Sequence, residues 1–147
     1  MSDGSIWRRP DLDPASLTLL QEGSLGGHLG ITVTEVGPEF LRATMPVDSR
    51  TLQPHGRLHG GASVALAETV GSMAANLTLD PSRQVAVGLE INANHARPVR
   101  KGLVTATATP EALGRTTQIW SIRIVDEFQK LVCISRLTMA IIPVERG

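Results

Sequence analysis

The sequence is short of net charge, aromatic side chains and cysteine, and each shortage excludes a class of protein. Fourteen acidic residues balance fourteen basic ones, so no excess positive charge favours nucleic acid or an anionic membrane as a partner. The single cysteine, Cys133, excludes an internal disulfide framework and is typical of a reducing compartment. Residues 1–10 contain no apolar signal-peptide core. We therefore expect a cytoplasmic protein that binds no nucleic acid.

A run of small and apolar residues, Leu58–Leu79, approaches the length of a membrane span but does not have its composition. It includes glycines, several hydroxyl side chains, Asn76 and the carboxylate of Glu68, all of which are costly in lipid. A helix buried within a protein fits this run better, and we expect no membrane partner.

The 147 residues suit one domain, which we expect to span residues 1–147. Asp13-Pro14 predicts a short helix that ends before Gly23. Gly71 lies inside a longer predicted helix, from Ala62 to about Leu77. Alternation of apolar and polar residues predicts strands at 31–36, 40–47, 85–95, 103–109, 116–125 and 131–142, with a separating turn at 110–114.

This order of elements predicts an α+β fold in which an antiparallel sheet wraps around a long central helix. The helix is rich in alanine, which lets the sheet approach closely. Gly71 costs about 1 kcal/mol of helix propensity. That cost indicates a point of especially close contact.

The start and the middle of the long helix together offer the groups needed to attack a carbonyl. Gly60 and Gly61 leave the first backbone N–H groups accessible, and those groups attract an oxyanion. Glu68 follows about two turns later, and Ser72 projects from the same helix face. A thioester is the best-suited substrate because its thiol, with a pKa near 8.5, leaves without a strong general acid.

Each residue also has a structural interpretation. Glu68 could be a solvent-facing or locally paired helix residue. The two glycines could simply join a loop to a helix. His59 and Gln53 could be hydrogen-bonding loop residues, and Ser72 a small residue in a crowded helix.

Other reaction classes lack their motifs. His55 and His59 have the i,i+4 spacing of a helical zinc site, but Pro54 and Gly56 argue against a helix there, so we expect no metal. The sequence contains no nucleophile-elbow, P-loop or dinucleotide-binding motif.

The chain resembles the hotdog-fold acyl-CoA thioesterases, in the branch of the 1,4-dihydroxy-2-naphthoyl-CoA, 4-hydroxybenzoyl-CoA and enterobactin-pathway proofreading thioesterases. The resemblance covers nearly the whole chain, and its strongest segments are 43–54, 59–72 and 87–95. Residues 135–138 add a weaker match.

The resemblance implies a hotdog fold and hydrolysis of an aromatic acyl-CoA. It makes Glu68 the nucleophile or general base, Gly60 the donor to the thioester carbonyl, Gln53 and His59 orienting groups, and Ser72 an assisting group near the acyl chain. It also implies a homodimer that completes the active site across the subunit boundary, assembled into a homotetramer. Coenzyme A would be part of the substrate, with no separate cofactor.

For substrate binding, Met73 is the candidate for the acyl pocket, and the candidates for CoA contacts are Arg97, Gly114, Arg115, Thr116 and Arg136. Arginine matches phosphate geometry, although a solvated surface charge is an equal alternative for each. Two other functions stay open: a β-hydroxyacyl thioester dehydratase using His59 and Glu68, and a non-catalytic acyl-CoA-binding sensor.

Overall fold

A computed structural model describes residues 4–145 of the chain. Residues 1–3 of the N-terminal segment, in which we expect no signal peptide, lie outside the described residues. In chain order the elements are α1 (Pro14–Leu19), α2 (Leu25–His28), β1 (Thr32–Val36), β2 (Leu41–Pro46), α3 (Gly60–Leu77), β3 (Gln84–His95), β4 (Leu103–Leu113), β5 (Thr117–Val125) and β6 (Leu131–Pro143).

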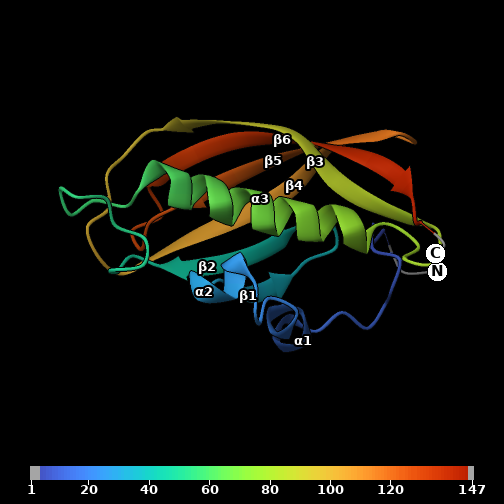
Figure 1. The fold of residues 1–147 in the computed structure, drawn as a ribbon, viewed down its shortest axis with the longest axis horizontal. Helices are drawn as coiled ribbons and strands as arrows, with labels where there is room; N and C mark the ends of the chain where they lie inside the picture. Colours follow the sequence, from blue (N-terminus) through green and yellow to red (C-terminus); the bar gives the residue numbers. More distant parts are fainter. Residues whose placement is uncertain (1–3, 146–147) are drawn as a thin grey trace.

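The strands form one antiparallel sheet in the order β1-β2-β4-β5-β6-β3. Helix α3 lies across one face of this sheet, and α1 and α2 lie beside β1 (Figure 1). The chain leaves β2, passes through α3 and returns as β3 at the opposite edge of the sheet. This arrangement confirms the predicted α+β architecture with its central helix.

Helix α3 buries one side against the sheet and leaves the other side half exposed. The buried positions come in adjacent pairs four residues apart, Ala62 and Ser63, Leu66 and Ala67, Val70 and Gly71, and Ala74 and Ala75. The half-exposed positions form the complementary pairs, Val64 and Ala65, Glu68 and Thr69, Ser72 and Met73, and Asn76 and Leu77. Within one chain, therefore, the sheet covers about half of the helix circumference.

Two boundaries differ from the sequence prediction by more than one residue, and one element was not predicted. Helix α3 begins at Gly60 rather than Ala62, because His59 caps it. Strand β4 continues through the expected turn at 110–114 as far as Leu113. Proline is tolerated there because β2 pairs with β4 only up to Ala108, so Pro110 lies beyond the region where both edges of β4 are paired. Helix α2 was not predicted, since its four residues include two glycines.

Gly71 marks the close contact that the sequence predicted. A Cβ atom at Gly71 would lie 2.7 Å from Leu137 Cδ2 and 3.2 Å from Ile122 Cδ1, both on fully buried side chains. We expect Gly71→Val to lower the free energy of unfolding by about 2 kcal/mol, because overpacking outweighs the gain in helix propensity. Urea denaturation should place Gly71→Ala between the variant and the wild type. A Gly71→Val protein as stable as wild type would contradict this packing.

None of the helices in residues 4–145 combines the length and the hydropathy needed to cross a membrane.

Candidate active site

A tightly folded loop between β2 and α3 carries Gln53. The buried hydroxyl of Thr51 donates to the Pro46 carbonyl at 2.8 Å and accepts from the Asp48 N–H at 3.1 Å. Arg50 forms two side-chain hydrogen bonds to the Asp48 carboxylate, and these lower the pKa of Asp48 below its usual value. The loop is therefore held by its own polar groups.

The side chain of Gln53 is partly used by this loop. Its Oε1 accepts from the His55 N–H, and its backbone carbonyl accepts from the Gly56 N–H at 3.0 Å. Its Nε2 makes no hydrogen bond to any residue in 4–145, so both amide protons remain available to an acceptor such as a substrate oxygen.

The first turn of α3 leaves one backbone donor without an acceptor. His59 Nδ1 accepts from the Gly61 N–H at 2.8 Å, and the His59 carbonyl accepts from the N–H groups of Ala62 and Ser63 at 3.0 and 3.2 Å. The Gly60 N–H has no acceptor among the described residues. This donor lies at the positive end of the helix dipole, where it can stabilise an oxyanion.

His59 serves first as the cap of α3. Because Nδ1 accepts a hydrogen bond from the Gly61 N–H, the ring N–H of His59 is at Nε2. Only that Nε2–H is left to contact a substrate. The commitment of Nδ1 to the helix disfavours the proton exchange that a dehydratase would require of this residue.

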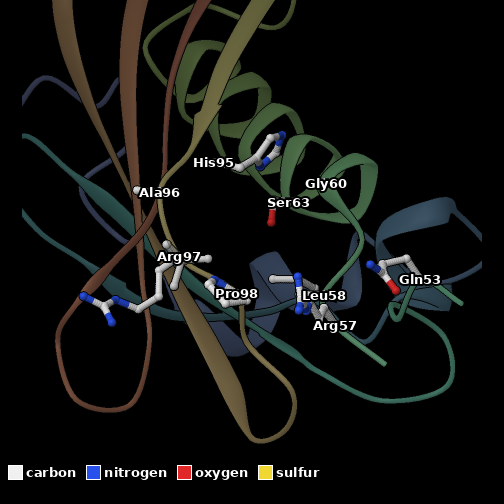
Figure 2. A pocket seen from close by; sticks show the side chains of 10 residues that line it. Gln53, Arg57, Leu58, Gly60, Ser63, His95, Ala96, Arg97 and Pro98 are labelled. Carbon is white, nitrogen blue, oxygen red and sulfur yellow. The ribbon is translucent and has the colours of Figure 1, made fainter. Parts of the chain in front are cut away.

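A pocket of 340 Å³, which we call the N-terminal pocket, opens beside this first turn (Figure 2). Its lining includes Gln53, Arg57, Gly60, Ser63, His95 and Arg97. Figure 2 shows His95 reaching from the end of β3 toward the start of α3, with Gln53 on the loop at the other side. A Cβ atom at Gly60 would lie 3.0 Å from His95 Nε2, so the imidazole contacts this turn closely.

The N-terminal pocket favours a negatively charged ligand. Arg57, Arg97 and His95 line it, and no carboxylate belongs to its lining; the Arg97 guanidinium points away from Gly60 and Gln53 (Figure 2). Neither arginine forms an ion pair with a carboxylate in residues 4–145. Of these three residues only Arg97 was predicted. His95 belongs to a segment of the family resemblance, but Arg57 carries no local signal beyond its charge.

Glu68 lies in the middle of the half-exposed side of α3, next to the edge strand. A Cβ atom at Gly88 of β3 would lie 3.1 Å from Glu68 Oε1. The carboxylate forms no hydrogen bond and no ion pair with any described residue. It does not line the N-terminal pocket, and eight residues of helix separate it from Gly60 by about 12 Å. One chain alone does not bring these two groups together.

A second pocket, of 430 Å³, lies farther along α3 and contains the other predicted helix residues. We call it the mid-helix pocket. Its lining includes Leu20, Gln21, Leu25, Thr69, Ser72 and Met73. No charged side chain lines it. Ser72 and Met73 thus face an uncharged pocket, lined by both apolar and polar side chains, that lies one turn beyond Glu68.

The remaining predicted substrate contacts are dispersed within one chain. Arg97 follows the end of β3, whereas Gly114, Arg115 and Thr116 form the β4–β5 turn. Through the pairing of β5 with β6 and of β6 with β3, this turn lies near the level of Gly88 in β3. Seven residues of strand separate Gly88 from His95, so the turn lies about 23 Å from the level of His95 along the strand direction. Arg136 is an exposed residue of β6, between these ends. A common role in binding would require more than one subunit.

Two other chemistries find no support among the described residues. Cys133 is buried, and burial raises the pKa of its thiol above the ordinary value, which is unsuitable for a nucleophile. No group of three potential metal ligands from His, Cys, Asp and Glu occurs in residues 4–145.

The family follows from comparison with known proteins. Residues 55–133 match the model of the thioesterase superfamily. The chain belongs to the thioesterase superfamily. It has the hotdog fold of these enzymes and is a thioester hydrolase.

Relatives of this thioesterase match it over nearly its whole length. The 1,4-dihydroxy-2-naphthoyl-CoA hydrolase of Escherichia coli is 50% identical over 93% of this chain and 99% of its own. The proofreading thioesterase EntH of Cronobacter sakazakii is 49% identical over 93% of this chain and 98% of its own. The crystal structure of a mutant thioesterase from Pseudomonas aeruginosa is 51% identical, with a TM-score of 0.93 over 95% of this chain and 100% of that one.

Proposed function

We propose that this thioesterase hydrolyses an aromatic acyl-CoA to the free acid and coenzyme A, at a site shared by two subunits. The observation that carries the proposal is the Gly60 N–H, which has no acceptor within residues 4–145 and lies beside a pocket lined by two arginines. An acyl-CoA supplies both a carbonyl oxygen for the donor and phosphates for the pocket. The Escherichia coli relative, named as a hydrolase of an aromatic acyl-CoA, supports the aromatic acyl group.

A homodimer is the smallest active unit in this proposal. Strand β3 is the last strand of the sheet, and it exposes Val87 and Leu89 by 40% and 61%. A long edge strand has unpaired backbone N–H and C=O groups, and exposed apolar side chains on it favour association. A second copy of β3 can pair with these groups and bury these side chains. A two-fold axis there would place two α3 helices side by side and antiparallel. If Val64 lay level with this axis, Gly60 would lie opposite Glu68 of the partner subunit.

The two pockets differ in charge, and each suits a different part of the substrate. The cationic N-terminal pocket suits the phosphates of CoA, and the uncharged mid-helix pocket suits the acyl group. The proposed dimer sets the N-terminal pocket of one subunit next to the mid-helix pocket of the other, with the thioester between them. Two such dimers form the homotetramer that we expect in the cytoplasm.

Catalysis then uses few groups. The Gly60 N–H polarises the thioester carbonyl, with the free protons of Gln53 Nε2 and His59 Nε2 orienting the carbonyl or the attacking water. Glu68 of the partner subunit either attacks the carbonyl carbon, expelling the CoA thiolate and forming a mixed anhydride that water cleaves, or deprotonates the water that attacks directly. Ser72 assists beside the acyl group. CoA leaves as product, so no separate cofactor is required.

A panel of CoA thioesters tests this function. We expect kcat/KM for benzoyl-, phenylacetyl- and naphthoyl-type substrates to exceed that for medium-chain aliphatic substrates by at least about tenfold, because a flat ring fills an apolar pocket with little loss of conformational freedom. Release of free thiol measures the rate. Preference for a medium-chain aliphatic substrate would overturn the aromatic assignment, and binding without thiol release would indicate a sensor.

A further inference from the structure

The α1–α2 side of the mid-helix pocket carries a polar group that has no hydrogen-bond partner in the described part of the chain. Two other polar side chains of this lining, Asn76 and Ser24, are already used, whereas the hydroxyls of Thr69 and Ser72 make no hydrogen bond within residues 4–145. Asn76 donates to the carbonyls of Ser72 and Ala86 at 2.9 and 3.1 Å and accepts from the Ala86 N–H at 2.9 Å. Ser24 donates its hydroxyl proton to the Gln21 carbonyl at 2.6 Å. The side-chain amide of Gln21, by contrast, has no hydrogen-bond partner among residues 4–145.

The position of Gln21 is nevertheless well fixed. Its backbone N–H donates to the Thr18 carbonyl at 3.0 Å, and its carbonyl accepts from the N–H groups of Ser24 and Gly27, each at 3.1 Å. These bonds hold Gln21 at the junction between α1 and α2, on the side of the pocket that faces α3.

Packing directs the amide toward the helix. The Gln21 Oε1 atom occupies the space that a Cβ atom at Gly26 would need, and the same point lies 3.3 Å from Thr69 Cγ2 of α3. The amide is therefore placed by the absence of a side chain at Gly26 and not by a hydrogen bond. Thr69 follows Glu68 directly, so this amide lies on the acyl side of the proposed site.

We propose that Gln21 determines specificity by hydrogen-bonding a hydroxyl or carbonyl substituent on the aromatic ring of the acyl group. This inference rests on the proposed function. Leu20, Leu25 and Met73 can enclose the ring, whereas the Gln21 amide can both donate to and accept from a ring substituent. An unsubstituted ring would cover the amide without pairing it, and an unpaired polar group at a covered site weakens binding.

The test compares a hydroxylated aryl-CoA with its unsubstituted counterpart. We expect wild type to favour the hydroxylated substrate by at least about tenfold in kcat/KM, and Gln21→Leu to reduce that ratio about tenfold. Glu22→Leu is the matched control, because Glu22 is exposed, adjacent in sequence and absent from the pocket lining, and it should keep the wild-type ratio. Calorimetric binding of both substrates to Glu68→Ala, with and without Gln21→Leu, gives the same ratio without turnover.

The outcomes separate this inference from the proposed function. A wild-type enzyme that hydrolyses both aryl-CoA substrates, with a ratio that Gln21→Leu changes by less than about twofold, overturns the role of Gln21 alone. Equal losses on both substrates also overturn it, since they indicate a packing role. Failure of wild type to hydrolyse either aryl-CoA overturns both proposals.

Discussion

Replacing Glu68 by alanine is expected to lower kcat for aryl-CoA hydrolysis by roughly a thousandfold while leaving folding and assembly intact. The loss follows because neither pocket has a carboxylate in its lining that could replace Glu68. The fold should tolerate the change because the Glu68 carboxylate makes no hydrogen bond or ion pair with any described residue. Thiol release measures the activity, and size-exclusion chromatography with thermal unfolding measures the assembly and stability.

Glu39→Ala provides the control for this substitution. Glu39 is an exposed carboxylate in the turn between β1 and β2 and lines neither pocket, so its loss should leave kcat near the wild-type value. Near-normal turnover by Glu68→Ala would refute the assignment of Glu68.

Replacing Gly60 by proline is expected to lower kcat about a hundredfold or more, because it removes the one backbone donor proposed to stabilise the oxyanion. Proline suits this position structurally. Gly60 is the first residue of α3, where proline is favoured, and His59 has φ −66° and ψ 131°, the conformation preferred before proline. Steady-state kinetics should show the loss mainly in kcat, since the donor acts most strongly on the transition state.

Gly60→Ala separates the steric effect from the loss of the donor. It keeps the N–H group but adds the Cβ atom that would lie 3.0 Å from His95 Nε2. If the donor is responsible, the alanine variant should retain far more activity than the proline variant. Equal losses would instead assign the effect to His95 and the shape of the pocket.

Mixing the two inactive variants tests whether the site is shared. When Glu68→Ala and Gly60→Pro subunits reassort at random, half of the dimers are mixed, and each mixed dimer regains one intact site, so about one quarter of wild-type activity should return. No recovery after verified subunit exchange would overturn the proposal that Gly60 of one subunit and Glu68 of its partner act at one shared site.

The sequence predicted the regular elements well because each has a strong local signal. The strands alternate apolar and polar residues, and α3 is a long run of small residues with no internal proline. The close contact between Gly71 and the sheet was also predictable, because a glycine in the middle of a helix lowers helix stability and is therefore expected where a side chain would not fit. By contrast, α2 contains two adjacent glycines and is too short to show periodicity.

The candidate site was only partly predictable. Glu68, Ser72 and Gly60 share one helix, so their relation can be read from local spacing. His95 contacts Gly60 only because β3 returns along the far edge of the sheet, and no local pattern encodes that crossing. Gln21 could not be predicted from the sequence. Its amide lies next to Thr69 only because Gly26 has no side chain, and this contact is not visible in the local sequence pattern.

The tight seat of α3 at Gly71 also indicates how enzymes of this fold can diverge. Because Leu137 and Ile122 pack directly against the backbone of Gly71, the helix cannot shift along the sheet to admit a longer or bulkier acyl group. The α1–α2 segment forms the opposite wall of the mid-helix pocket and exposes Leu20 and Leu25 by 69% and 61%, so exchanges there disturb little buried structure. New substrate preferences can therefore evolve on this wall while the catalytic helix stays fixed.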